Sequence, residues 1–114
     1  MKLSDVKILL ECEILSCSEK LDAEVKACMS SDMMSDVLAY TKPGALLITG
    51  LTNSQSVRTA EIADSAGIVY VRGKRPDEHT IALAEELGIP LLSTKRGMFE
   101  TCWTLHAAGL AGIC

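Results

Sequence analysis

Three short segments bring hydroxyl or basic side chains to places where a helix is expected to begin. They are residues 49–53 (Thr-Gly-Leu-Thr-Asn), 72–76 (Arg-Gly-Lys-Arg-Pro) and 93–97 (Ser-Thr-Lys-Arg-Gly). Free backbone N–H groups and the helix dipole attract phosphate or carboxylate at such positions. The last two segments hold five of the 11 basic residues of a chain whose net charge is −4, namely Arg72, Lys74, Arg75, Lys95 and Arg96. These segments predict a site for a small anionic ligand.

The residues expected to contact such a ligand share a place in these loops: Thr49, Gly50, Thr52, Asn53, Arg72, Gly73, Ser93 and Thr94. A simpler interpretation is that the loops are polar because they cap helices. Thr52 and Gln55, for instance, fit a capping box without any ligand. Both interpretations stay open on the sequence.

Patterns that carry catalysis are missing from the sequence. Residues 50–56 lack the Gly-Lys-Ser/Thr ending of a P-loop, so no lysine is placed to hold β- and γ-phosphates. Neither G-x-S-x-G nor H-E-x-x-H occurs. Cys102 and His106 have the i, i+4 spacing of a nucleophile and its base, but a helix face offers no oxyanion site. We predict a protein that is not an enzyme and uses no metal or cofactor.

The chain has five cysteines, Cys12, Cys17, Cys28, Cys102 and Cys114, and no C-x-x-C pair. The spacing of Cys12 and Cys17 does not fit a zinc knuckle. We therefore expect reduced thiols that are mostly buried as small hydrophobic side chains. Cys114 is expected to be exposed and open to oxidation into artificial dimers.

Charge and hydropathy argue against two classes of partner. The basic residues form no stripe like those that bind phosphate backbones, so we expect no nucleic acid. No apolar run approaches the ~20 residues that span a bilayer, so we expect no membrane association. The first residues, Met-Lys-Leu-Ser-Asp, turn polar at once and do not resemble a signal peptide. The expected location is the cytoplasm.

The elements that must position the three loops follow from periodicity and from capping residues. Helices are expected over 4–11, 31–40, 53–66, 76–87 and 98–108, and strands over 12–16, 24–29, 45–49, 68–71 and 89–92. The continuous apolar run Ala-Leu-Leu-Ile-Thr at 45–49 is typical of a strand covered on both faces. Alternating strands and helices predict one α/β domain over 1–114, with a largely parallel sheet of about five strands between helical layers.

Four segments carry a resemblance to a known family. They are Ser-Asp-Met-Met-Ser-Asp-Val at 31–37, Gly-Ala-Leu-Leu-Ile-Thr-Gly-Leu at 44–51, Arg-Gly-Lys-Arg-Pro-Asp-Glu at 72–78 and Gly-Ile-Pro-Leu-Leu-Ser-Thr at 88–94. Over residues 25–110 the chain resembles the DRTGG domain, although the five letters that name the family do not occur in it. That domain is similar to the amino-terminal domain of HPr kinase/phosphorylase and to a region of some phosphotransacetylases. The resemblance implies a non-catalytic, often dimeric regulatory domain.

The functional hypothesis is a regulatory or ligand-sensing domain that binds a small anionic or nucleotide-like metabolite, or a protein partner. A homodimer is expected because the apolar flank of Phe99 and Trp103 and the tail 110–113 need covering. Two alternatives stay open. One is a small enzyme or a phosphotransferase fragment, of the kind that is mislabelled as an HPr serine kinase. The other is a dimerisation scaffold without a ligand.

Overall fold

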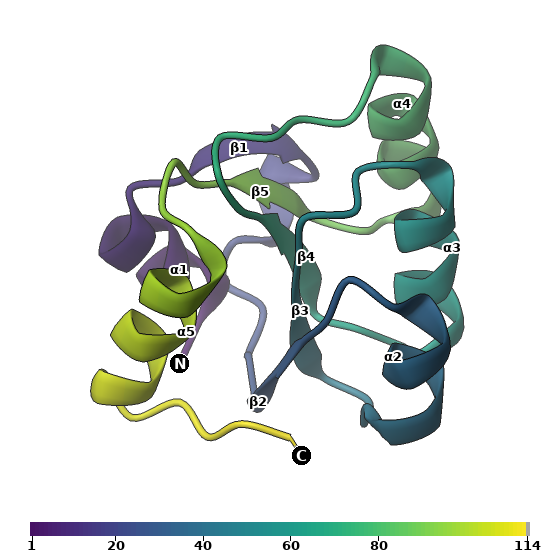
Figure 1. The fold of residues 1–114 in the computed structure, drawn as a ribbon. Coiled ribbons are helices and arrows are strands. Elements are labelled where there is room, and N and C mark those ends of the chain that lie inside the picture. The colour runs from purple at the N-terminus through teal and green to yellow at the C-terminus, as the bar shows by residue number, and fades with distance from the viewer. Residues whose placement is uncertain (114) are drawn as a thin grey trace.

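A five-stranded sheet lies between two layers of helices in the computed structural model, which describes residues 1–113 (Figure 1). The strand order is β1-β5-β4-β3-β2. The strands are β1 (Glu13–Ser16), β2 (Ala27–Ser30), β3 (Ala45–Thr49), β4 (Gly67–Tyr70) and β5 (Leu91–Ser93). Strands β2 to β5 run parallel, and β1 pairs antiparallel with β5. The largely parallel sheet of about five strands is confirmed.

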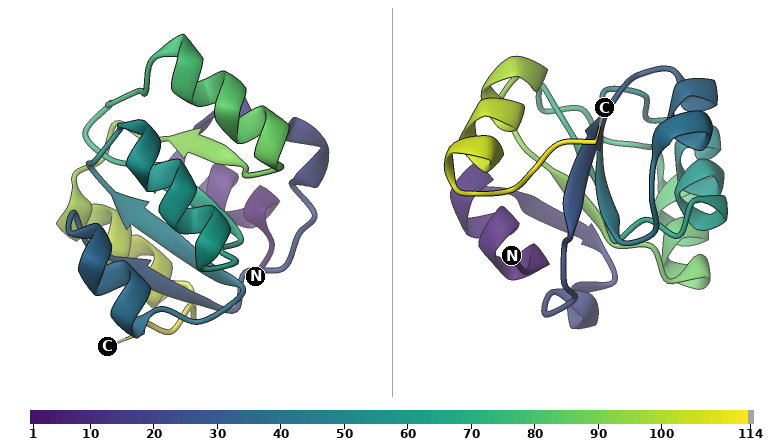
Figure 2. Two further views of the ribbon diagram at one scale, coloured as in Figure 1. Left: turned by 90° about the vertical axis from the view of Figure 1, so that its right-hand side faces the viewer. Right: turned by 90° about the horizontal axis from the view of Figure 1, so that it is seen from below.

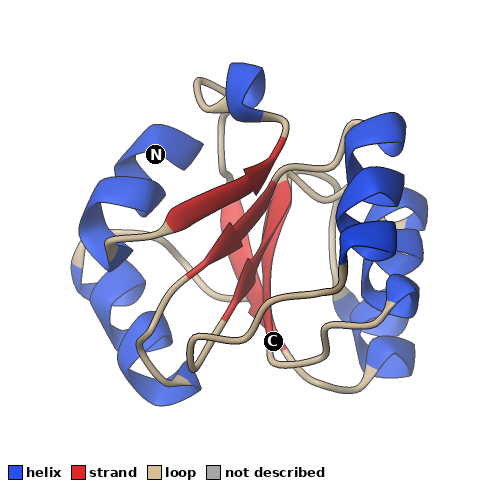
Figure 3. Ribbon diagram, turned by 90° about the horizontal axis from the view of Figure 1, so that it is seen from above, coloured by secondary structure: helices blue, strands red, loops and turns tan. Residues whose placement is uncertain are grey.

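Helices cover both faces of the sheet, as predicted (Figures 1, 2 and 3). On one face lie α1 (Leu3–Leu10) and α5 (Met98–Ala107). On the other lie α2 (Met34–Tyr40), α3 (Ser54–Ile62) and α4 (Glu78–Leu87). A short 3₁₀ turn, Ser18–Lys20, follows β1. Among residues 1–113 there is no helix whose length and apolar character would let it cross a membrane.

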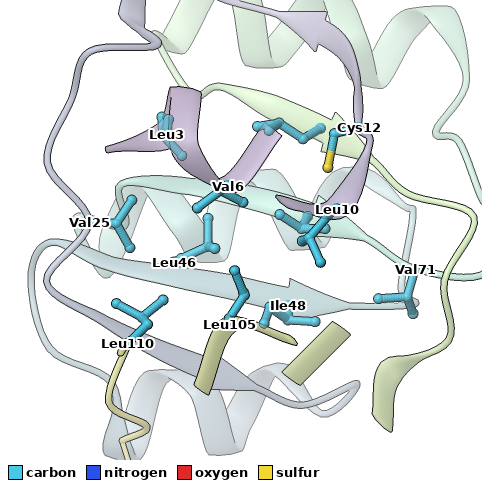
Figure 4. Close-up of a cluster of buried hydrophobic side chains, with 12 residues drawn as sticks. Leu3, Val6, Leu10, Cys12, Val25, Leu46, Ile48, Val71, Leu105 and Leu110 are labelled. Atoms are coloured by element: carbon cyan, nitrogen blue, oxygen red, sulfur yellow. The ribbon is translucent and has the colours of Figure 1, made fainter. Parts of the chain in front are cut away.

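Strand β3 is buried along its whole length and divides the core into two halves. Leu46 and Ile48 point toward α1 and α5, where they meet Leu3, Val6 and Leu105 (Figure 4). The intervening side chains of the strand face α2, α3 and α4. Because each fully buried aliphatic side chain stabilises the fold by about 1.5–3 kcal/mol, this strand is the centre of the structure.

The predicted burial of the cysteines holds fully for two of the four that the structure describes. Cys12 and Cys17 are buried, Cys28 and Cys102 are half-buried, and all four are free thiols. Burial raises the pKa of the Cys12 and Cys28 thiols to about 12 and, together with the Glu85 carboxylate, that of Cys17 to about 11. These three thiols therefore stay protonated near neutral pH. Cys114 lies outside the described residues.

The second strand differs from the prediction for 24–29. It begins only at Ala27 and extends to Ser30. Val25 precedes it, donates its backbone N–H to the Met1 carbonyl, and packs in the α1 and α5 half of the core. Met29 packs in the other half. Val25 and Met29 therefore pack in opposite halves of the core, because the regular alternation of a strand does not extend back to Val25.

Two helix ends also differ from the prediction. The helix expected from Ser31 begins at Met34, because the Ser31 hydroxyl instead accepts the backbone N–H of Met33. The helix expected to reach residue 66 ends at Ile62.

The tail at 110–113 was expected to need covering, but it packs on the protein itself. Leu110 is buried, and backbone hydrogen bonds join Ala111 and Ile113 to Cys28 on the edge strand β2.

Two isoleucines, one in the core and one on the surface, allow a matched stability test. Ile48 is fully buried, whereas Ile62 is 72% exposed. We expect Ile48→Ala to lower the free energy of unfolding by about 2–5 kcal/mol through lost burial and a cavity. Ile62→Ala should change it by no more than about 0.5 kcal/mol. Denaturant titration followed by circular dichroism measures both values, and equal losses would contradict the assigned core.

Candidate anion-binding site

The parallel strands bring the three predicted loops to one edge of the sheet. Because β3, β4 and β5 run in the same direction, the loops 49–53, 72–76 and 93–97 all leave from their carboxyl ends (Figure 1). We call this the carboxyl edge. Strand β2 ends there too, so the segment that follows it, Ser31 to Met33, joins the same group of loops.

Backbone hydrogen bonds tie two of these loops together. The Arg72 N–H donates to the Arg96 carbonyl and the Gly73 N–H to the Thr94 carbonyl, both at 2.8 Å. Arg72 and Gly73 have φ values of +61° and +69°, so the turn after β4 is left-handed at two successive residues. A left-handed arginine costs backbone energy, which the cross-loop hydrogen bonds offset. This turn directs the Arg72 side chain toward β3.

Two of the predicted ligand residues have hydroxyls that are engaged inside the protein. Ser93 donates to the Lys74 carbonyl at 2.8 Å, and Thr94 donates to the Leu10 carbonyl at 2.8 Å. Both residues are buried. Their hydrogen bonds hold the loop after β5 against the loop after β4 and against α1. The Gly73 N–H is likewise used within the protein, although Gly73 itself is exposed, so all three residues use these groups to shape the edge.

Asp32 is the residue of this edge that the sequence reasoning missed. Its Oδ1 accepts the Gly50 N–H at 2.7 Å and the Thr49 hydroxyl at 3.1 Å. Its Oδ2 lies 3.9 Å from the Arg72 guanidinium. We had expected Asp32 in the first turn of a helix. The position of Asp32 follows from the direction of β2. Because β2 is parallel to β3, the segment that follows it lies at the carboxyl edge.

Arg72 lies directly over Gly50. A Cβ atom at position 50 would collide with the guanidinium, so only glycine leaves room for this arrangement. Lys74 approaches from the same side and donates from Nζ to the Gly50 carbonyl at 3.3 Å. The Arg72 side chain remains 46% exposed. It therefore presents a cation to solvent beside the first residues of the β3–α3 loop.

The start of α3 completes this part of the edge. Asn53 is the N-cap of the helix, but its side chain makes no capping hydrogen bond, and neither Thr52 nor Gln55 forms the expected capping box. Thr52 is half-buried and Asn53 is exposed. Within residues 1–113 the structure gives the hydroxyl of Thr52 no hydrogen-bond partner. Thr52, Asn53 and Arg72 thus all belong to the carboxyl edge, where Asn53 and Arg72 are exposed.

The other cations of the predicted cluster are mostly paired within the protein. Arg75 pairs with Glu13. Arg96 contacts Glu11 and Glu100 at 3.3 Å and donates to the Leu9 carbonyl at 2.8 Å. Exposed pairs of this kind contribute about 0–1 kcal/mol each, yet they reduce the positive potential that an incoming anion meets. Lys95 is exposed in the loop after β5, whereas Arg72 and Lys74 lie beside Gly50 and are therefore the cations best placed for a ligand at the β3–α3 loop.

A larger hollow of about 730 Å³ lies away from the carboxyl edge, beside the start of α1 and the end of α5. Its lining includes the side chains of Ile8 and Leu9 and two carboxylates, Asp5 and Glu24. Glu24 is 2.9 Å from the amino terminus. Its lining also includes Lys26, and its two carboxylates offset the charges of Lys26 and the amino terminus, so its size does not make it the better candidate for an anion.

One cluster has the residue types of a metal site. The ligand atoms of Cys17, Glu19 and Glu85 lie within 4.8 Å of one another. However, the Glu85 carboxylate accepts the Cys17 backbone N–H at 2.6 Å, and burial with this carboxylate raises the pKa of the thiol to about 11. Metal binding requires a thiolate, so the hydrogen bond and the raised pKa both oppose it.

The fold and this edge define a class, the open α/β sheet domains that keep their polar loops at the carboxyl ends of parallel strands. Within that class, the chain belongs to the DRTGG domain family, whose model matches residues 5–108. The resemblance stated from the four sequence segments is therefore confirmed. No curated protein matches the chain.

A solved structure of similar fold comes from Clostridium perfringens. It contains the CBS and DRTGG domains of the regulatory region of a pyrophosphatase, in complex with the activator diadenosine tetraphosphate. The superposition has a TM-score of 0.76 at 15% sequence identity, and covers 91% of this chain and 45% of the other. This chain thus spans less than half of the clostridial one. The likeness establishes the shared fold, and in the clostridial protein the family's domain is part of a regulatory region.

The bonds to Asp32 predict a pH dependence of stability. The Gly50 N–H lowers the pKa of this carboxyl most; partial burial opposes the effect, and Thr49, Arg72 and Lys74 add to it. Because the folded pKa is depressed, the carboxylate stabilises the fold above the unfolded pKa of about 3.9, and this stabilisation is lost as pH falls through the folded value.

We therefore expect Asp32→Asn to be less stable than wild type at pH 7 and the difference to shrink below about pH 4. Thermal unfolding from pH 7 to pH 2.5 measures it. Asp36→Asn is the control, since Asp36 is exposed on α2 and makes no side-chain hydrogen bond within residues 1–113. A constant difference between wild type and Asp32→Asn over this range would contradict the prediction.

Proposed function

We propose that this chain is a non-catalytic regulatory domain that senses a small phosphate-bearing metabolite of the nucleotide type at its carboxyl edge. The observation that carries the proposal is the exposed Arg72 guanidinium over Gly50, beside a helix start that has no side-chain cap. An arginine together with outward N–H groups at a helix start is a favourable arrangement for phosphate. The nucleotide activator of the clostridial regulatory region supports the choice of ligand class.

The predicted ligand residues divide into two groups in this proposal. Thr49, Gly50, Thr52, Asn53 and Arg72 contact the ligand. The remaining residues hold the loops in place: Gly73, Ser93 and Thr94. We propose no reaction at this edge, because the sequence supplies no P-loop lysine. A cytoplasmic location also stays a prediction.

We further propose that the domain acts as a homodimer through α5. Phe99 and Trp103 are 85% and 63% exposed, and their spacing of four residues puts them on one face of the helix. Large exposed aromatic side chains are enriched in protein interfaces. In a two-fold dimer this face of α5 packs against the same face of the second copy, so each copy covers the aromatic side chains of its partner. A scaffold without a ligand would use the same surface.

The ligand proposal is tested by Arg72→Ala. We expect the affinity for ADP to fall at least about tenfold, because a charge-assisted hydrogen bond contributes about 1.5–3 kcal/mol. Arg58→Ala is the matched control, since Arg58 is exposed on α3. Isothermal titration calorimetry with ADP and with inorganic phosphate measures both variants. Equal affinity for Arg72→Ala and wild type, or binding by neither, would remove the site.

The dimer proposal is tested by light scattering under reducing conditions, which exclude disulfide-linked species. We expect wild type to be dimeric at micromolar concentration and Trp103→Glu to be monomeric, because the charge would be buried without a partner. Ile62→Glu is the control, since Ile62 is similarly exposed but lies on α3, in the opposite layer of helices. A wild-type monomer, or a dimer that survives Trp103→Glu, counts against the role of α5.

A further inference from the structure

We propose that Asp32 is an internal competitor for the ligand, a carboxylate that occupies the anion position until a phosphate displaces it. This inference rests on the proposed function, since it concerns the same edge. The carboxylate already contacts the donors that an anion would use there. It accepts the Gly50 N–H at 2.7 Å and the Thr49 hydroxyl at 3.1 Å, and it lies 3.9 Å from the Arg72 guanidinium.

Charge explains why the carboxylate and a phosphate exclude each other. Two anions a few ångströms apart repel, and the donors of Gly50 and Thr49 cannot serve both at full strength. A phosphate dianion brings twice the charge and more acceptor oxygens, so it gains more from Arg72 and Lys74 than the carboxylate loses. A monoanion such as acetate gains no such advantage. Asp32 thus selects ligands that carry a doubly charged phosphate.

The structure also gives Asp32 a way to leave. Its side chain is 55% exposed, so a rotation about its own bonds brings the carboxylate into water. The flanking backbone stays anchored, because the Ser31 N–H donates to the Ile48 carbonyl at 3.1 Å and the Ser31 hydroxyl accepts the Met33 N–H at 3.0 Å. Displacement therefore requires a side-chain movement and leaves β2 and α2 in place.

The affinity of Asp32 variants for inorganic phosphate and for ADP tests this inference. We expect Asp32→Ala to bind both about tenfold more tightly than wild type, since it removes a competing charge-assisted interaction. Asp32→Asn should fall between the two, because it keeps the acceptor oxygen and loses the charge. Asp36→Ala and Asp36→Asn change the net charge equally on the neighbouring helix and should leave the affinity unchanged. Acetate should not compete with phosphate in wild type.

The other outcomes of this titration contradict the inference in different ways. Weaker binding by Asp32→Ala would make Asp32 a support for the ligand and overturn the inference. Equal binding by wild type and both Asp32 variants would also overturn it, while leaving a ligand site that depends on Arg72 intact. Binding by no variant, measured for proteins whose circular dichroism matches wild type, would overturn both the inference and the proposed function.

As a second readout, phosphate added to wild type should shift the amide NMR signal of Gly50, and an unshifted Gly50 signal at saturation counts against displacement.

Discussion

The parallel pairing of β2, β3, β4 and β5 is the constraint on which the rest of this structure depends. Parallel strands must be joined by connections that return to the other end of the sheet, and helices provide them. These connecting helices, α2, α3 and α4, cover one face of the sheet, and α1 and α5 cover the other, which is why β3 contains only buried residues. The same pairing sends the loops that follow these four strands to one edge. The core and the candidate site are thus two consequences of one strand arrangement.

The carboxyl edge gathers basic side chains in a chain whose net charge is −4. Most of its cations meet a carboxylate or a carbonyl of the protein itself, as Arg75 and Arg96 do. Arg72 differs, because its nearest carboxylate is held at 3.9 Å by hydrogen bonds to other groups. An edge of this kind has its donors in place before a ligand arrives. In the proposed mode of binding, a phosphate takes the place of the Asp32 carboxylate and the flanking backbone stays where it is.

The edge and the exposed face of α5 are physically connected. The Arg72 N–H donates to the Arg96 carbonyl, and Arg96 directly precedes Gly97, the N-cap of α5. Phe99 lies in the first turn of that helix. A ligand that holds Arg72 therefore acts on a backbone bonded to the start of the helix with the apolar flank. Such a connection transmits a signal only if the ligand favours one arrangement of the helices over another.

The sequence by itself determined the layers of this protein. The apolar run of β3 and the alternation of strands with amphipathic helices were enough to predict a parallel sheet covered on both faces, because burial and periodicity are local properties. The sequence also placed Arg72 and Gly50 in loops of the same edge. Only the tertiary structure decided which groups stay available there. The Thr94 hydroxyl bonds to Leu10, 84 residues away, and Asp32 bonds to Gly50 from a different strand. Neither partner follows from spacing along the chain, because each hydrogen bond joins segments that meet only when the strands pair.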